Sequence, residues 1–346
     1  YTTIKKPSDY FNTKLYTGNG STNAITGVGF QPDWIWIKDR DTAQHNRLAD
    51  VVRGVKKNLK SDTTDAENTT DSNNGLQSFD SDGFTLTQDS NDHGYNANGS
   101  SQVSWNWLAN GAGSANTQGD IASTVSANTT SGFSIVSYTG NGSAGATVGH
   151  GLGSTPKMII VKRRNTAAQW NVYHESLGNT GALYLNDTIA FNVVAGFWNN
   201  TSPNSTTFTL GTDAAGNGSG DTYIAYCFAE KQGYSKFGKY VGNGSTDGTF
   251  VYTGFKPAYL MVKRTDSTGN WAIYNNKSQT SNQMDKQMYA NLTNAEGTSG
   301  TKIFDFLSNG FKARGSAADI NASSGDYIYM AFAEEPLVGD NPATAR

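Results

Sequence analysis

One segment of the sequence matches the residue pattern of a cofactor-binding motif. Residues 140–145 read Gly-Asn-Gly-Ser-Ala-Gly, which satisfies the G-x-G-x-x-G pattern of loops that hold a dinucleotide pyrophosphate. A genuine loop of this kind follows a strand and opens a helix. Here the next residues include Gly149, Gly151 and Gly153, which disfavour a helix. We therefore interpret the segment as a turn and predict no cofactor.

The same segment belongs to a hexapeptide that recurs along the chain. It reads Tyr-Thr-Gly-Asn-Gly-Ser at residues 16–21 and 138–143, and Tyr-Val-Gly-Asn-Gly-Ser at 240–245. Only the middle copy keeps the glycine spacing, because Asn23 and Asp247 stand where the others need the last glycine. Asn-Gly favours a type I′ turn, in which both central residues have positive φ. We therefore expect a β-hairpin turn in each copy.

Residues that could act as nucleophiles, bases or metal ligands are few and scattered. The four histidines do not recur between the copies, and none has metal-ligand spacing or a nucleophile context: His45, His93, His150 and His174. His174 and Glu175, which follow Trp170, form the one aromatic–imidazole–carboxylate grouping and the one candidate for a pocket. The single cysteine, Cys227, excludes an internal disulfide and fits a structural thiol. We predict no catalytic residue.

Two acidic stretches could suggest calcium. Residues 80–83 (Asp-Ser-Asp-Gly) lack the remaining ligands of a twelve-residue calcium loop. The second stretch is more typical of a solvated loop and comprises Asp62, Asp65, Glu67 and Asp71. We therefore predict no metal site. A polysaccharide depolymerase would need two carboxylates facing across a groove. Because the sequence does not show which carboxylates meet, that alternative stays open as the less favoured one.

One polar feature recurs with the hexapeptide. The same predicted strand ends three times in basic residues, namely Lys38 with Arg40, Lys162 with Arg163 and Arg164, and Lys263 with Arg264. Solvation of the strand ends is the simpler interpretation. The functional alternative is a basic rim that meets an anionic glycan or an acidic neighbouring subunit.

These residues are carried by three repeats of roughly 100 residues. After each hexapeptide three landmarks follow in one order: QPDWIWIKDR, TPKMIIVKRR or KPAYLMVKRT; then SDGFTL, STTFTL or SNGFKA; then VSWNWLA, IAYCFAE or IYMAFAE. The landmarks divide the chain into an N-terminal arm (1–9), a first repeat (10–110), a linker of Gly, Ser, Ala, Asn and Thr (111–131), a second repeat (132–232), a third repeat (233–336) and a C-terminal tail (337–346).

Period-two patterns predict strands with two distinct faces. In the first landmark one face is aliphatic in every repeat: Ile35 and Ile37, Ile159 and Val161, and Leu260 and Val262. The other face carries Trp34 and Trp36, so this strand should lie centrally or against a neighbouring repeat. The closing strand alternates an apolar trio, such as Val103, Trp105 and Trp107, with smaller residues. We expect each trio to stabilise its own repeat.

Composition and pattern together predict an all-β protein of three tandem antiparallel β-sandwiches, of jelly-roll or lectin-like form. The 346 residues include 39 glycines and 12% aromatics but only 16% charged residues. Residues 48–59 could form one or two helical turns, interrupted by Gly54. A net charge of −3 gives no reason to expect nucleic acid as a partner. No apolar run is long enough for membrane insertion.

In these landmarks the chain resembles a repeated domain of virion proteins of tailed phages, notably phages of marine bacteria. The resemblance is strongest in the first repeat, in FNTKLYTGNGSTNAITGVGFQPDWIWIKDR (11–40), SFDSDGFTLTQD (78–89) and VSWNWLA (103–109). It implies a sandwich of lectin-like shape and a structural or adhesive role, with no catalytic residue to carry over.

The expectation that follows is a non-enzymatic virion surface protein, assembled in the host cytoplasm. We favour a tail-fibre or head-fibre adhesin that presents its loops to a host-surface glycan. A capsid decoration protein that contacts the shell is the close alternative. The expected partners are other virion proteins, in a homo-oligomeric or lattice-bound arrangement, and a host glycan.

Overall fold

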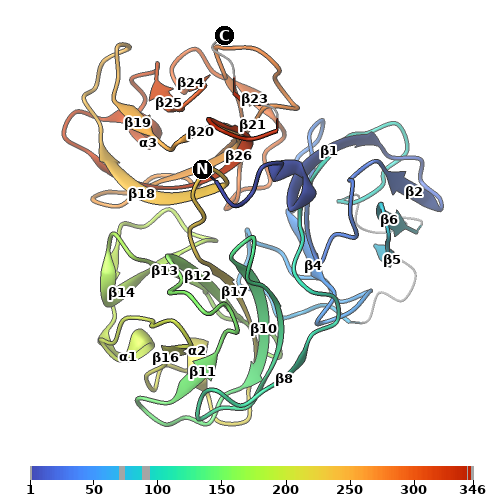
Figure 1. Ribbon diagram of the computed structural model, residues 1–346, viewed down its shortest axis with the longest axis vertical. Helices are drawn as coiled ribbons and strands as arrows, with labels where there is room; N and C mark the ends of the chain where they lie inside the picture. Colours follow the sequence, from blue (N-terminus) through green and yellow to red (C-terminus); the bar gives the residue numbers. More distant parts are fainter. Residues whose placement is uncertain (1, 70–74, 88–93, 341, 344–346) are drawn as a thin grey trace.

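The computed structural model describes residues 2–69, 75–87, 94–340 and 342–343. Asp71 and His93 lie outside these residues. The protein is all-β, with several antiparallel sheets, and the sheets form three groups around a common centre (Figure 1). Each group is built from one of the sequence repeats and contains a larger and a smaller sheet.

The first repeat has the narrowest of the three larger sheets. Its larger sheet has the order β1 (Phe11–Thr17), β7 (Ser101–Trp107), β3 (Trp34–Asp39) and β4 (Arg47–Asp50). Its smaller sheet has the order β2 (Asn23–Thr26), β6 (Gly83–Leu86) and β5 (Leu76–Asp80). A short 3₁₀ helix, η1 (Pro7–Asp9), precedes β1. Residues 51–57, after β4, form turns rather than the helical turns expected over 48–59, because residues 47–50 are drawn into the sheet beside β3.

The second repeat has the widest sheet. The order is β15 (Asn192–Val193), β14 (Gly178–Tyr184), β13 (Trp170–His174), β12 (Met158–Arg163), β17 (Thr222–Phe228), β10 (Phe133–Thr139), β9 (Ser123–Asn128) and β8 (Ser114–Asn116). Its smaller sheet pairs β11 (Thr147–Gly149) with β16 (Thr207–Thr209). Two single-turn helices, α1 (Ala195–Trp198) and α2 (Ala214–Asn217), lie between these strands in the chain.

The third repeat repeats the arrangement without the two outer strands β8 and β9. Its larger sheet has the order β18 (Ser235–Val241), β26 (Asp326–Pro336), β20 (Phe255–Arg264), β21 (Ala272–Asn275), β22 (Lys286–Tyr289) and β23 (Gly297–Thr298). Its smaller sheet has the order β19 (Phe250–Tyr252), β25 (Gly310–Ala313) and β24 (Phe304–Leu307), and one short helix, α3 (Ala318–Asn321), precedes β26.

Each repeat buries apolar faces in two different places. Between its two sheets lies a core of its own, which takes the predicted aliphatic face: Ile35 and Ile37, Ile159 and Val161, and Leu260 and Val262. The opposite faces of all three repeats meet in one continuous cluster at the centre of the molecule. There the rings of Trp34 and Tyr226 stack with centroids 4.4 Å apart, and those of Phe11 and Phe332 stack at 5.0 Å. The two-faced prediction for this strand is confirmed.

The closing strands β7, β17 and β26 differ from expectation. Their apolar trios face the shared centre: Val103, Trp105 and Trp107; Ile224, Tyr226 and Phe228; Ile328, Met330 and Phe332. The smaller residues between them, such as Ala225 and Cys227, face the core between the two sheets of their own repeat. The prediction that each trio stabilises its own repeat is therefore wrong. Burial of the trios stabilises the association of the three repeats.

Residues 111–131 are not a free linker. They contain β8 and β9, and β9 pairs with β10, so that the segment extends the larger sheet of the second repeat (Figure 1). Its two large apolar residues, Ile121 and Val125, are buried in the core of that repeat. The polar composition misled the prediction because a strand added to a sheet edge is held by backbone groups, which Ser and Thr supply as well as any residue.

The repeated hexapeptide is a crossing loop rather than a hairpin turn. β1 pairs with β7 and β2 pairs with β6, so residues 16–21 carry the chain from one sheet to the other. Of the two central residues only Gly20 has positive φ, at 66°, whereas a type I′ turn needs both. The Asn19 side chain instead accepts a hydrogen bond of 2.9 Å from the backbone N–H of Ser21, as in an Asx-turn. In the middle copy the chain then enters β11, not a helix.

A buried asparagine holds each copy of the loop in the same way. Its side-chain oxygen accepts the backbone N–H of the hexapeptide asparagine: Asn96 from Asn19 at 3.0 Å, Asn217 from Asn141 at 2.9 Å, and Asn321 from Asn243 at 2.9 Å. The hexapeptide tyrosine donates to the carbonyl just before that asparagine, as Tyr240 does to Ile320 at 2.6 Å. We call these hydrogen bonds the asparagine latch. The hexapeptide recurs because each repeat uses the same hydrogen bonds to hold this loop.

Candidate functional site

The three recurring lysines are buried and join one repeat to another. Lys38, Lys162 and Lys263 are fully inaccessible. Their ammonium groups donate to threonine carbonyls of another repeat: Lys38 to Thr293 at 2.7 Å, Lys162 to Thr64 at 2.8 Å, and Lys263 to Thr188 at 3.1 Å. Burial lowers the pKa of each ammonium group to about 8. Both predictions for these lysines, solvated strand ends and a rim for an anionic partner, are wrong because the charges do not reach the surface.

The accepting threonines lie in three equivalent segments, which we call the bridging loops: residues 60–67, 184–191 and 289–296. The carbonyl of the first residue in each loop accepts a hydrogen bond from a side chain of the neighbouring repeat, eight positions after its buried lysine. The pairs are Lys60 with Trp170 at 2.8 Å, Tyr184 with Trp271 at 2.9 Å, and Tyr289 with Asn46 at 3.0 Å. The last N–H donates to the carbonyl two positions after a lysine: Glu67 to Arg164 at 2.7 Å, Phe191 to Thr265 at 2.9 Å, and Glu296 to Arg40 at 2.9 Å. The first repeat thus contacts the third, the third contacts the second, and the second contacts the first.

Two of these contacts carry an ion pair as well. Arg164 binds both carboxylate oxygens of Glu67, at 2.9 and 3.0 Å, and Arg40 binds those of Glu296 at 2.8 and 3.0 Å. Burial alone would raise the pKa of Glu67, but Arg164 and Arg53 outweigh it and hold that pKa below its usual range. The acidic neighbour expected for the basic residues is therefore another repeat of the same chain.

The remaining predicted basic residues pair within their own repeats: Arg163 with Asp221 at 2.7 Å and Arg264 with Asp266 at 2.9 Å. The bridging loops themselves are not among the predicted landmarks. Each contains Thr-x-Ala at its fifth to seventh positions, which is the one sequence signal that distinguishes them. Three residues are too short a signal to find without the contacts that they make.

A buried ionic cluster lies where the first and second repeats meet. Arg53 donates to Asp50 at 2.5 Å and to Glu67 at 3.0 Å. The hydroxyl of Tyr226 donates to Asp50 at 2.8 Å. The side chains of Asp50 and Arg53 are completely buried, so this cluster has no access to a substrate. Its chemistry is that of a paired and hydrogen-bonded internal charge.

The histidines serve packing in the residues that the structure describes. His150 and His174 are buried, and each accepts at Nδ1 the N–H of the residue two positions on, at 3.2 Å. Nε2 of His174 lies 3.3 Å from the carbonyl of Tyr329 in the third repeat. Burial lowers the pKa of His174 to about 4. His174 is thus a buried interface residue at the end of β13, not part of a pocket.

Two further candidates are also structural. Nδ1 of His45 lies 2.5 Å from a carboxylate oxygen of Asp62, whose other oxygen accepts the N–H of Asn46 at 2.9 Å. This pair holds the start of a bridging loop beside β4. Cys227 is buried, and burial raises the pKa of its thiol. A buried thiol in its protonated form is a poor nucleophile.

The acidic stretches do not gather into a cation site. Asp82 accepts the backbone N–H groups of Gly27 at 2.9 Å and Gly29 at 2.7 Å, which lowers its pKa. Asp65 lies 3.5 Å from Lys60. Within residues 2–69, 75–87, 94–340 and 342–343, no group of three or more His, Cys, Asp or Glu is placed to hold a metal ion. In the same residues no helix is long and apolar enough to cross a membrane.

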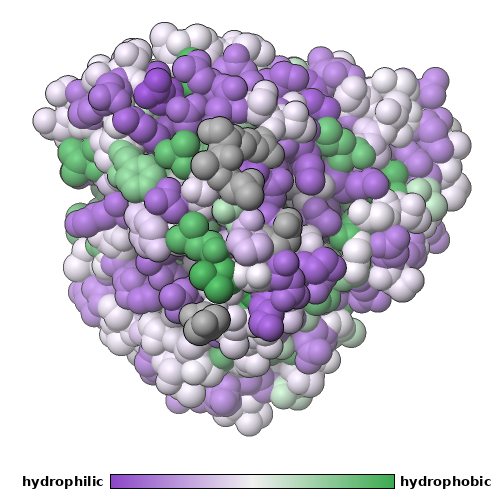
Figure 2. Space-filling view, turned by 45° about the horizontal axis from the view of Figure 1, so that its top comes forward, coloured by the Kyte–Doolittle hydropathy of each residue, from purple (hydrophilic) through white to green (hydrophobic). Residues whose placement is uncertain are grey.

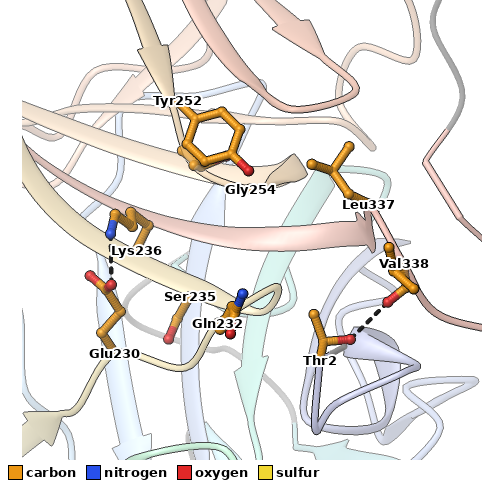
Figure 3. A pocket seen from close by; sticks show the side chains of 10 residues that line it. Thr2, Glu230, Gln232, Ser235, Lys236, Tyr252, Gly254, Leu337 and Val338 are labelled. Carbon is orange, nitrogen blue, oxygen red and sulfur yellow. Dashed lines mark hydrogen bonds and ion pairs between the residues drawn. The ribbon is translucent and has the colours of Figure 1, made fainter.

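A cleft of about 520 Å³ lies at one edge of the third repeat (Figure 3). In this view Tyr252 and Leu337 lie above Ser235 and Gln232. At one end Lys236 pairs with Glu230 at 2.7 Å (Figure 3). At the other end the hydroxyl of Thr2 donates to the carbonyl of Val338 at 2.8 Å. The cleft therefore lies between the edge strands β18 and β19 and is bounded at one end by Thr2 and Val338.

Apolar side chains are exposed at this edge. Seven large hydrophobic residues are exposed among those that the structure describes, and five belong to the cleft or its edge strands: Val241, Phe250, Tyr252, Leu337 and Val338. Tyr252 and Phe250 on β19 are 57% and 44% exposed. The face in Figure 2 is mostly hydrophilic, with small separate hydrophobic spots. Exposed apolar side chains gathered at one edge make that edge a candidate contact surface.

The lining of the cleft combines hydrogen-bonding groups with few charged side chains. Its one carboxylate is Glu230, which is paired with Lys236. Hydrolysis of a glycosidic bond needs a second carboxylate roughly 5–10 Å away, and the lining supplies none among the described residues. The amide group of Gln232 can donate and accept hydrogen bonds there, whereas the Thr253 hydroxyl already donates to the carbonyl of Phe255 at 2.7 Å.

Comparison with known proteins identifies a family but no function. Residues 6–336 match a family described as a domain of unknown function (DUF7483). No curated protein and no solved structure matches the chain. The match extends over all three repeats, the bridging loops and seven of the ten residues that line the cleft. The chain therefore belongs to the DUF7483 family.

Proposed function

We propose that the protein is a non-enzymatic surface component of a phage particle and attaches to a neighbouring protein through the open edge of its third repeat. In this proposal each repeat is one two-sheet β-sandwich, and the three sandwiches act as a single body. The observation that carries the proposal is the concentration of exposed apolar side chains around the cleft between β18 and β19.

The single-body part of the proposal is supported by the shared centre. The central cluster takes residues from all three repeats, and the buried lysines and bridging loops add polar contacts at each junction. An interface with an apolar centre and satisfied polar groups resists domain motion. Such a body suits a component that must keep its shape in a particle.

The non-enzymatic part is supported by where the reactive groups lie. The buried histidines, the thiol and the ionic cluster of Asp50 and Arg53 are engaged in packing, and the cleft offers a single paired carboxylate. The location in a virion is supported by the resemblance of the repeats to phage structural proteins.

A host-glycan adhesin is the second candidate. The Tyr252 ring is 57% exposed beside Thr253, Gln232 and Glu230, and an aromatic face next to hydrogen-bonding groups is a surface on which a sugar ring can stack. The capsid or tail contact ranks first because Phe250, Val241 and Leu337 extend the apolar area beyond what one sugar ring would cover.

Labelling of purified particles tests the proposal. Gold-labelled antibody against the chain should decorate virions at regular positions on the head or tail. Particles that contain no copy of the chain would overturn the virion role. Release of reducing sugar from host polysaccharide by the purified chain would overturn the non-enzymatic role.

A further inference from the structure

The open edge of the third repeat has a covered counterpart in the second repeat. β10 and β18 both end in the hexapeptide, and β11 and β19 both follow it, so the two pairs of strands are equivalent. In the second repeat β9 pairs with β10, and Ile121 bridges to Val148 of β11. Among the described residues of the third repeat, β18 pairs with no strand other than β26, apart from one isolated bridge between Ser235 and Lys231, and β19 pairs only with β25.

The covering segment also fills the opening between the two sheets. Ile121 and Val125 are 5% and 6% exposed and belong to the core of the second repeat. The corresponding opening in the third repeat is the cleft of about 520 Å³. In the first repeat β1 likewise pairs only with β7 among the described residues, and the Asn12 side chain donates across to the carbonyl of Val28 at 3.0 Å. The third repeat thus has the open form of a site that a strand fills in the second repeat.

The third repeat has no connection of its own with which to cover this edge. The first and second repeats are joined by residues 110–132, which are long enough to form β8 and β9. The second and third repeats are joined by residues 231–234 alone, between Glu230 and β18.

We propose that this edge binds an extended segment of a partner protein, which adds a strand beside β18 and closes the cleft with aliphatic side chains. The inference rests on the proposed function, attachment to a neighbouring protein, and specifies the form of the partner. Addition of a strand to an open sheet edge is a general mode of peptide recognition, in which backbone hydrogen bonds give affinity and side-chain pockets give specificity.

The backbone of β18 is oriented for such an addition. The N–H of Gly242 donates to the carbonyl of Gly325 on the β26 side. The N–H of Phe237 instead points the other way and meets the Glu230 carboxylate at 3.3 Å. Because donors alternate along a strand, the N–H groups of Lys239 and Val241 face outward, as those of their counterparts in β10 face β9. A partner strand would bond to these outward groups.

The differences between the two edges define the chemistry of the partner. In the second repeat the hydroxyl of Thr147 donates to Asp120 at 2.7 Å. Phe250 occupies the place of Thr147 in the third repeat, so the partner should carry an apolar residue instead of an aspartate there. Tyr252 occupies the position of Gly149, and its ring can cover the apolar residue of the partner. The partner should also keep aliphatic residues at the two positions four residues apart that Ile121 and Val125 occupy.

A peptide copied from the covering segment is a direct probe. We would label residues 119–129 (GDIASTVSANT), together with its Asp120→Leu and Val125→Asp versions, and measure fluorescence anisotropy with the full chain. The Asp120→Leu peptide should bind saturably and about tenfold more tightly than the original, because leucine meets Phe250. Val125→Asp should weaken binding about tenfold or more, because a carboxylate would be buried without a partner. Equal binding of all three peptides would overturn the proposal.

Matched variants of the protein locate the binding. Lys239→Pro removes one outward N–H without touching the pairing to β26, and it should weaken the Asp120→Leu peptide about tenfold. Lys239→Thr keeps the N–H and should bind like the unmodified chain. Hydrogen exchange should show new protection in β18 and none in β10. Self-association through β18, or glycan binding with no peptide binding, would replace the proposed occupant. If the antibody labels virions but the peptides do not bind, the virion role stands and only the strand-addition site is overturned.

Discussion

Lys162 of the second repeat donates a hydrogen bond of 2.8 Å to the main-chain carbonyl of Thr64 in the first repeat. The same ammonium group donates to the carbonyl of Ala168 in its own repeat at 2.6 Å. One buried side chain therefore satisfies carbonyls on both sides of a junction. Lys38 and Lys263 make the corresponding contacts at the other two junctions.

Replacement of Lys162 by methionine tests this role. Methionine keeps the aliphatic stem, but the Ala168 carbonyl loses its donor, at about 1–3 kcal/mol when it stays buried, and the Thr64 carbonyl keeps only the N–H of Ala168. Relief from burying a charge offsets part of the loss, so we expect the free energy of unfolding in urea to fall by about 2 kcal/mol. Exposed Lys277, changed to methionine, is the control and should shift it by less than about 0.5 kcal/mol. An unchanged Lys162→Met protein would contradict the bridging role.

Truncation of Trp34 tests the shared centre. Its ring is fully buried and lies 4.4 Å from the rings of both Trp107 and Tyr226. Trp34→Ala should cost about 3–5 kcal/mol. Because the cluster belongs to all three repeats, calorimetry should still show one transition at a lower temperature. A first repeat that melts separately while the others keep their original transition would argue against a single cooperative body.

The asparagine latch can be tested in the third repeat. Asn321 is fully buried and bonds to the N–H of Asn243 at 2.9 Å and to the carbonyls of Ser245 and Gly315 at 2.8 and 3.0 Å. Asn321→Ala should cost about 2–3 kcal/mol and increase hydrogen exchange across residues 242–247. The exposed Asn294, changed to alanine, should do neither. Unchanged exchange in the loop would show that the latch is dispensable.

His174 makes the stability depend on pH in acid. Burial lowers its folded pKa to about 4, below the ordinary value of 6.5. Between these values the unfolded chain binds the proton more readily, so stability is fully present above about pH 6.5 and is lost as the pH falls towards 4, by up to about 3 kcal/mol. Burial lowers the pKa of His150 too, so it acts in the same direction.

Urea denaturation at pH 4.5 and pH 7 measures this effect. The loss between the two values should be smaller in His174→Gln, which keeps a donor for the Tyr329 carbonyl but does not titrate. The same loss is measured in His45→Gln for comparison, because the His45 side chain is 32% exposed whereas that of His174 is buried. If His174→Gln and the unmodified chain lose the same free energy of unfolding in acid, the loss belongs to other groups.

Much of the local structure was predictable because it follows from short-range patterns. Alternation placed Ile35 and Ile37 in the core between two sheets, and Trp34 and Trp36 against other repeats, as the structure has them. The exclusion of a phosphate loop at residues 140–145 rested on glycines that disfavour a helix, and β11 follows there.

Other features depend on contacts between distant residues, which one sequence does not show. A lysine at the end of a strand looks solvated until the bridging loop that covers it is placed, so Lys38, Lys162 and Lys263 were misassigned. Residues 111–131 look like a linker because backbone pairing leaves little trace in side-chain composition. The cleft could not be predicted either, since it exists only because an edge that is covered in the second repeat is uncovered in the third.

The cyclic order of the junctions fixes the number of repeats. Each repeat uses one surface, with its lysine, to hold one neighbour, and a different surface, with its bridging loop, to be held by the other. Such head-to-tail contacts close into a ring only at a fixed count, and otherwise continue as a filament. Here the third repeat returns to the first through Lys38 and Thr293, so the ring closes within one chain and no complementary surface is left over. A fourth repeat would have to break a junction to enter. Loss of any one repeat would leave one remaining repeat with an unpaired lysine surface and the other with an unpaired bridging loop.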